Sequence, residues 1–187
     1  MDLPKNLKLT RNGVDKLRQG MQQLQASEVM VGFPEDTSAR TIEKGEKDIT
    51  NAALAYIHDK GDSEANIPRR EFMRPGMESA KDQVTATLTA TAARLLRRPS
   101  KLVVQQGLMQ VGIQVQVAIK KEINKGVPPP LSEATLLKRA AKGRKGAAKE
   151  LERRAQGLPP STQFAKPLID TGQLRNAVNF VIRPRRR

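Results

Sequence analysis

Two long segments of helical periodicity constrain this chain more than any other feature of its sequence. In residues 76–98, apolar or small residues recur every three or four positions, and Arg97-Arg98-Pro99 ends the pattern. Residues 101–124 continue with the same spacing, and Lys125-Gly126 resembles a C-cap. The sequence therefore predicts two consecutive long helices, although residues 111–117 also alternate like a strand. The periodic positions are Met77, Ala80, Val84, Leu88, Thr91 and Leu95, then Val104, Leu108, Val111, Val115 and Ile119.

Shorter elements precede these helices. Leu7 and Leu9 suggest a weak strand, and the spacing of apolar residues predicts a helix over residues 13–27. Residues 29–33 are rich in β-formers and end at Pro34, which predicts a short strand, whereas residues 35–48 are polar and predict an exposed loop. A helix is expected from Asn51, stopping at Lys60-Gly61-Asp62.

The C-terminal third changes character at Gly126. Residues 127–131, VPPPL, predict an extended spacer, followed by a short helix near residues 134–141. The basic, glycine-interrupted residues 138–154 are expected to order only against a partner. A single helical turn over residues 173–176, capped by Asp170 or Thr171, leads to a last strand at residues 177–182.

These elements predict an α+β fold, in which a small antiparallel sheet packs against two or three long helices and a proline-rich, basic C-terminal arm extends from it. The expected division is a core at residues 1–125, an extension at 126–166, and a turn and strand at 167–187 that complete the core. Aromatic residues are 3% of the chain and cysteine is absent, so the core is aliphatic and disulfides are excluded. We expect a soluble protein, because no apolar run of membrane-spanning length and no targeting signal is evident.

The segment from Ile67 to Pro75, IPRREFMRP, predicts a rigid docking loop. Pro68 and Pro75 restrict the residues before them, Ile67 and Arg74, to extended backbone. A loop that is already ordered loses less entropy when it binds. The side chains expected to meet a partner include Arg69, Arg70 and Phe72.

The positive charge is concentrated at the C-terminal end. Residues 120–187 hold 17 Lys/Arg against 5 Asp/Glu, which accounts for +12 of the net charge of +15. Such a block favours a polyanion or an acidic protein surface as its neighbour, and a solvated face is the alternative interpretation. The residues expected to contact DNA or an acidic partner are Lys138, Arg139, Lys142, Arg144, Lys145, Lys149, Arg153 and Arg154.

Catalytic motifs are not evident in the sequence. His58 is the only histidine, so a site built from paired imidazoles is excluded. Ser161 and Thr162 have no base in a nucleophile-activating motif, and neither a GxxxxGK[ST] nor a GxGxxG phosphate-binding motif occurs. Asp59, Asp62 and Glu64 depart from calcium-loop spacing and are interpreted as solvated loop residues. We expect no enzyme activity, no metal and no cofactor.

The order of several motifs resembles the tailed-bacteriophage tail-completion and neck proteins, also called virion morphogenesis or head–tail connector proteins. The motifs are AALAYIHDKG, IPRREFMRP, GVPPPLSEAT and PLIDTGQLRNAV, and together they span roughly residues 50–182. Glu71 departs from the pattern, because the family more often has proline or a small residue at that position.

The resemblance implies a structural virion protein that forms a ring at the junction of head and tail, with a hexamer favoured and a dodecamer as the alternative. It implies contacts with adjacent neck, portal-side adaptor and tail-tube proteins, with genomic DNA in the channel, and synthesis in the host cytoplasm without membrane association. The subunit-docking residues carried over are Ile67, Pro68, Arg69, Arg70, Phe72, Arg74, Pro75, Asp170, Thr171, Gly172, Leu174 and Arg175. The alternative is a DNA-binding accessory protein that uses its basic third without sequence specificity.

Overall fold

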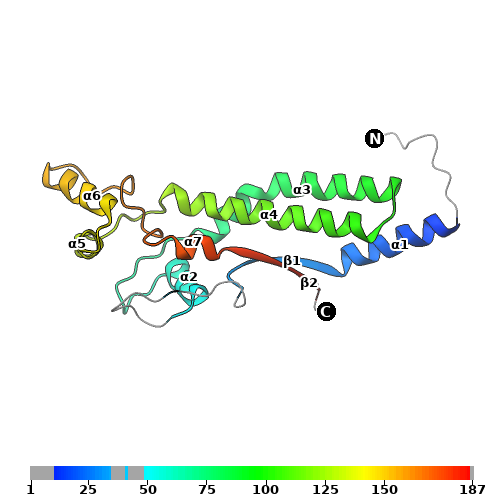
Figure 1. Ribbon diagram of the computed structural model, residues 1–187, viewed down its shortest axis with the longest axis horizontal. Helices are drawn as coiled ribbons and strands as arrows, with labels where there is room; N and C mark the ends of the chain where they lie inside the picture. Colours follow the sequence, from blue (N-terminus) through cyan, green and yellow to red (C-terminus); the bar gives the residue numbers. More distant parts are fainter. Residues whose placement is uncertain (1–10, 35–40, 42–48, 186–187) are drawn as a thin grey trace. The chain divides into compact units, whose positions relative to one another are not determined.

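The computed structural model describes residues 11–34, 41 and 49–185 and has the α+β fold predicted from the sequence (Figure 1). Its described part holds seven helices and one two-stranded antiparallel sheet. The strand expected at Leu7 and Leu9 lies outside the described residues, as does most of the expected loop at 35–48. The elements are α1 (Arg11–Gln25), β1 (Ser27–Gly32), α2 (Asn51–Lys60), α3 (Met73–Arg97), α4 (Lys101–Lys125), α5 (Glu133–Ala141), α6 (Lys145–Ala155), α7 (Gln173–Ala177) and β2 (Asn179–Pro184).

The chain divides into two compact units. Unit 1 comprises Met1–Val31, Ala80–Val115 and Phe180–Arg187, and unit 2 comprises Gly32–Ser79 and Gln116–Asn179. Helices α3 and α4 are each divided between the two units. This division differs from the boundary expected at residue 125, because the proline-rich and basic residues pack within unit 2.

The core of unit 1 is aliphatic, as expected. Leu95 of α3 packs with Val103, Val104 and Leu108 of α4. Leu17 and Leu24 of α1 and Val29 of β1 cover this cluster. Close approach of the helices depends on glycine, since a Cβ at Gly107 would lie 2.4 Å from the Thr91 hydroxyl. The helical reading of residues 111–117 is confirmed over the strand alternative, because α4 is continuous.

The sheet has a fixed register within unit 1. The Arg185 amide donates to the Ala26 carbonyl at 2.7 Å, and Arg183 donates to Glu28 at 2.6 Å. On the other face Val29 meets the core, and Phe180 lies against Gly112 of α4. Both strands differ from their expected bounds by about two residues, because Ala177 still belongs to α7 and β1 already begins at Ser27.

Helix α3 begins at Met73, before the expected start at Gly76. The buried Asp59 carboxylate of α2 accepts hydrogen bonds from the amides of Phe72 and Met73, at 3.1 and 3.2 Å. Pro75 is accommodated because the first-turn N–H groups of a helix have no intrahelical acceptor. The expectations of an extended Arg74 and of a solvated Asp59 were therefore wrong.

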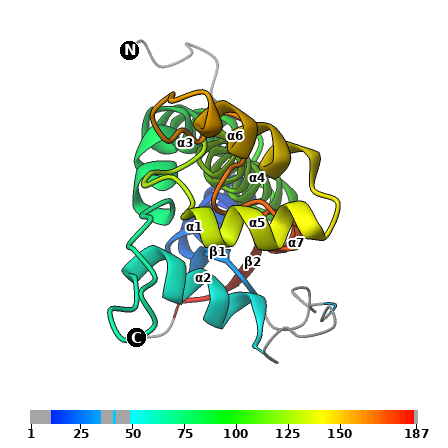
Figure 2. The same cartoon turned by 90° about the vertical axis from the view of Figure 1, so that its left-hand side faces the viewer.

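The basic residues 138–154 form helices in the structure, which corrects the expectation that they order only against a partner. Helices α5 and α6 pack against each other in unit 2 (Figure 2). Ser132 caps α5, and Gly143 supplies the positive φ of the turn between the helices, +79°. Their small core contains Leu136 and Ala147, with Leu131 and Ala165 from the flanking segments.

Helix α4 is long and apolar enough, by length and composition alone, to cross a membrane. Its best window has a mean hydropathy of 1.3, so the expectation that no run reaches spanning length was wrong. The same window is 44% buried inside the protein. Glutamines recur along α4, and Gln114 and Gln116 hydrogen-bond to Thr87 and to the Val178 carbonyl.

Candidate functional site, an arginine-lined pocket

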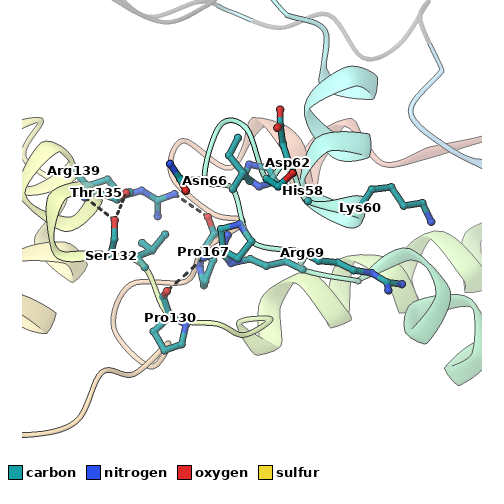
Figure 3. A pocket seen from close by; sticks show the side chains of 16 residues that line it. His58, Lys60, Asp62, Asn66, Arg69, Pro130, Ser132, Thr135, Arg139 and Pro167 are labelled. Carbon is teal, nitrogen blue, oxygen red and sulfur yellow. Dashed lines mark hydrogen bonds between the residues drawn. The ribbon is translucent and has the colours of Figure 1, made fainter.

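A pocket of about 920 Å³ opens in unit 2 (Figure 3). Its walls come from the end of α2, the loop after it, the proline segment before α5, α5 itself and Pro167. Residues 67–70 of the predicted docking loop and Arg139 of the predicted basic contact set both line it. Segments that are far apart in the sequence therefore meet at one site.

The loop after α2 is held by short-range interactions. Gly61 ends the helix at φ +81°, as its sequence predicted. Asp62 and Ile67 form an antiparallel bridge, and the Asp62 carboxylate accepts the Ala65 amide at 3.0 Å. Asn66 completes the turn with φ +51°, a left-handed conformation that asparagine tolerates better than most residues. The loop is ordered without a partner.

Arg70 ties this loop to the proline segment. Its side chain donates from Nε to the Pro129 carbonyl at 3.0 Å, and its amide donates to the His58 carbonyl at 2.7 Å. The residue is only 5% exposed, and burial followed by repulsion from Arg139 lowers its pKa. Its assignment as a docking residue was therefore wrong, because the guanidinium is already committed inside the chain.

Arg139 ties the C-terminal segment, residues 166–169, to α5. Its guanidinium donates to the carbonyls of Lys166, Pro167 and Ile169, at 3.0, 2.9 and 2.9 Å, and Figure 3 shows it directed at Pro167. Burial is the main reason that its pKa is lowered. Arg139 thus braces residues 166–169, and its expected contact with DNA or an acidic partner stays a prediction.

His58 lies beside these two arginines. Burial, and then the charges of Arg70 and Arg139, lower its pKa from 6.5 to about 4. The imidazole is therefore neutral at pH 7, and its Nδ1 is buried without a hydrogen-bond partner. A neutral ring fits this place because a third positive charge would be repelled.

Arg69 and Arg74 are the exposed cations of the docking segment. Both pair with Glu71, at 3.0 and 2.7 Å, and Arg74 also meets Glu78 at 3.2 Å. The hydrogen bond from Arg74 is the main reason that the pKa of Glu71 is lowered. Glu71, the departure from the resembled motif, is therefore the residue that holds the two arginines together. Figure 3 shows Arg69 extending away from Arg139.

The remaining docking predictions divide by burial. Phe72 is fully buried and meets Phe33 edge to face, with ring centroids 6.3 Å apart. Gly172 and Leu174 are also buried, so these three assignments to a docking surface were wrong. Arg175 donates to the side chain of Asn124 at 3.2 Å. The other residues of the set are exposed or half-buried: Ile67, Pro68, Pro75, Asp170 and Thr171.

The capping prediction at residues 170–171 holds in part. Gly172 is the N-cap residue of α7 and makes no side-chain cap. The Thr171 hydroxyl accepts the Gln173 amide at 3.3 Å, while Asp170 pairs with Arg144 at 2.9 Å.

The predicted basic contact set separates by residue type. Arg153 and Arg154 pair with the fully buried Glu150 at 3.0 Å each, and Arg144 pairs with Asp170. Glu150 also accepts the Ser161 amide at 2.8 Å. These arginines therefore pair with carboxylates of their own chain, and their expected contact with DNA or an acidic partner stays a prediction. The lysines of the set are exposed on α5, α6 and the turn between them: Lys138, Lys142, Lys145 and Lys149.

The pocket offers the cations Arg70 and Arg139 and the neutral imidazole of His58. Among the described residues, no group of three or more His, Cys, Asp or Glu side chains is placed to hold a metal ion. No sequence pattern predicts directly that Asp59 and Glu150 are buried, although Glu150 precedes two arginines at helical spacing. Comparisons of this chain with protein-family models, with curated proteins and with solved structures found no match.

Proposed function

We propose that this protein is a structural subunit of the phage head–tail junction, which forms a ring through which DNA is retained and ejected. One observation carries the proposal: the segments that resemble neck proteins meet in one hydrogen-bonded framework. Arg70 of IPRREFMRP donates to the proline segment, and Arg139 donates to the carbonyls of the segment before DTGQL. Residues that share a motif order and also support one another are best explained as one module.

The framework leaves the exposed pair Arg69 and Arg74 on its surface, with side chains 56% and 63% accessible. Glu71 holds them close together, which lowers the entropy lost when they bind a neighbour. They are our candidates for contact with carboxylates of the adjacent ring or subunit.

The experiment is genetic complementation of the encoding phage with Arg69→Glu/Arg74→Glu. We expect normal folding by circular dichroism but failure to join heads to tails in negative-stain microscopy. The matched control is Arg97→Glu/Arg98→Glu, which reverses two exposed cations at the end of α3. Normal particles from the first variant would remove the docking role, and absence of the wild-type protein from virions would refute the proposed function.

A second function is favoured by the exposed lysines of α5, α6 and their connecting turn. Four lysines on a helical pair fit the backbone of a DNA duplex without reading its sequence. If all four contact phosphates, the slope of log K against log salt would be about −3.6. Replacement of the four lysines by glutamine should remove that slope, and negligible binding by the wild-type protein at physiological salt would exclude this function.

A further inference from the structure

Arg70 is a buried cation without a carboxylate partner in the described part of the chain. Its side chain donates to the carbonyls of Pro129 and Pro130, which are neutral acceptors. Such hydrogen bonds satisfy the N–H groups but leave the positive charge uncompensated. Buried charges are ordinarily paired, as Glu150 is with two arginines elsewhere in unit 2. Arg70 is therefore a buried charge that the described residues do not balance.

Arg139 adds a second positive charge to the same pocket. Its side chain is 15% accessible, and Asp170 lies 3.9 Å from its Nε but pairs more closely with Arg144, at 2.9 Å. The charge of Arg139 contributes to the lowered pKa of Arg70. Among the described residues of the pocket wall, Asp62 is the acidic one, and its carboxylate accepts a backbone amide of its own loop. Figure 3 shows Asp62 directed away from Arg139, so the pocket keeps an excess of positive charge.

Hydrogen-bond donors remain available beside these charges. The Arg139 guanidinium has five N–H groups, and three of them meet carbonyls. The hydroxyls of Ser132 and Thr135 bond to each other at 2.9 Å, which uses only one of their two O–H protons. Figure 3 shows the Asn66 amide and Arg139 directed into the same part of the pocket. Positive charge combined with several donors is the chemistry that recognises an oxyanion.

We propose that this pocket binds the carboxylate of an aspartate or glutamate side chain from an acidic segment of a partner protein. Arg139, Asn66 and the hydroxyl pair of Ser132 and Thr135 supply the contacts, and Arg70 contributes its charge. The site goes beyond the proposed function and does not depend on it, because binding is a property of the purified protein.

The size and walls of the pocket favour a protein segment over a phosphate. A volume of about 920 Å³ has room for a ligand of drug size, so a single phosphate ion would leave most of it empty. The phosphates of a DNA duplex lie on a broad rod that cannot follow a narrow entry to Arg139. The rest of the wall is apolar and suits the hydrocarbon part of an acidic side chain and its neighbours: Ile67, Pro68, Pro130, Leu131 and Pro167.

His58 gives a direct report of binding, because it lines the pocket and is the only histidine of the chain. Burial, and then the charges of Arg70 and Arg139, lower its pKa to about 4. A bound carboxylate offsets both arginines, so binding should raise the pKa of His58 towards 6.5, and protonation of His58 should in turn strengthen binding. The charged groups that surround the imidazole are Arg70, Arg139, Lys60, Asp62 and Asp170.

The test follows the ring resonances of His58 by NMR as the pH is lowered from neutral, at low ionic strength. The probe is the capped peptide acetyl-Leu-Glu-Leu-amide at millimolar concentration, and the matched peptide has glutamine in place of glutamate. The glutamate peptide should raise the pKa of His58 and bind at least about tenfold more tightly than the glutamine peptide. Equal effects of the two peptides, or no shift with either, would overturn the site. So would inorganic phosphate that shifts the resonances where the glutamate peptide does not, because the pocket would then take a phosphate ligand.

Asn66→Asp tests the location of the site with a variant that keeps the fold. Asn66 is exposed, and aspartate also tolerates its left-handed backbone. The new carboxylate should raise the pKa of His58 without peptide and weaken binding of the glutamate peptide by at least about tenfold. The control is Lys60→Gln, which removes a cation of the pocket rim whose side chain is 55% accessible and directed away from Arg139 in Figure 3.

Lys60→Gln should leave peptide binding nearly unchanged, because an exposed charge is screened by solvent. Circular dichroism should show that both variants keep the wild-type fold. Binding by Asn66→Asp as tight as that of the wild-type protein would overturn the proposed site. An equal loss of binding in Lys60→Gln would also overturn it, because general surface charge would then explain the attraction.

Discussion

Acid should lower the free energy of unfolding of this protein through His58. It should do so at a pH above the range in which the buried carboxylate of Glu150 titrates. The folded pKa of His58 is about 4 against an ordinary value of 6.5, so the unfolded chain binds the proton more readily. Stability is therefore full above pH 6.5 and falls as the pH is lowered towards 4. Between pH 7 and 4.5 the loss from this one group is about 2.5 kcal/mol.

The assay is urea unfolding followed by circular dichroism at pH 7, 6, 5 and 4.5. With a slope of about 1–3 kcal/mol per molar urea, the midpoint should fall by roughly 1–2 M over this range. The matched variant His58→Gln keeps a polar side chain without a titrating group, so its midpoint should change much less. Glu150 has a folded pKa of about 2, so its contribution is lost only below about pH 4.5.

Parallel curves for the wild-type protein and His58→Gln would refute this reasoning. They would mean that the imidazole gains a proton in the folded state about as easily as in the unfolded chain. The repulsion from Arg70 and Arg139 would then be screened by solvent in the pocket. A second check is His58→Lys, whose permanent charge should destabilise the protein at pH 7 as well.

Three further substitutions test packing and capping by the same unfolding assay. Asp59→Ala removes the acceptor of the Phe72 and Met73 amides at the start of α3, and should lower the free energy of unfolding by about 2–4 kcal/mol. A loss under ~0.5 kcal/mol would show that water replaces the carboxylate. Gly76→Ala should lower the free energy of unfolding by about 1–3 kcal/mol despite alanine's helix propensity, because the added Cβ would lie 2.8 Å from the Ile119 backbone. A stabilised variant would contradict that packing. Glu150→Gln should cost about 3–5 kcal/mol and reduce the acid sensitivity below pH 4.5, whereas an unchanged acid limb would argue against the paired carboxylate.

The long helices were predictable because their signal is local. Apolar residues at helical spacing bury one face of α4 whatever lies opposite, and the Lys125-Gly126 stop depends only on neighbouring residues. The start of α3 depended instead on Asp59, fourteen residues before Met73 and on another helix. Sequence reasoning placed Asp59 in a solvated loop, because no local pattern reveals which amides a carboxylate will accept.

The order of helix α6 could not be predicted from the sequence either, because it depends on contacts between distant residues. Its apolar content is small, and sequence reasoning took its glycines and cations as signs of disorder. In the structure the buried Glu150 pairs with two arginines and accepts a hydrogen bond from the Ser161 amide. These interactions anchor the helix, which has few apolar side chains to do so. A buried acid surrounded by arginines is recognised only when its neighbours in space are known.

Residue type, more than total charge, separates the half-buried from the exposed cations of α5, α6 and the turn between them. The planar guanidinium donates in several directions at once, which suits it to bind carbonyls and a carboxylate in tight places, as Arg139 and Arg154 do. The compact, strongly hydrated ammonium of lysine gains less from such sites and stays in solvent. A net charge of +15 therefore overstates the cations that α5 and α6 can offer to DNA. Any nucleic-acid affinity of this segment should come from its lysines, so lysine-to-glutamine changes should weaken binding while arginine-to-glutamine changes at Arg139 or Arg154 should unfold it first.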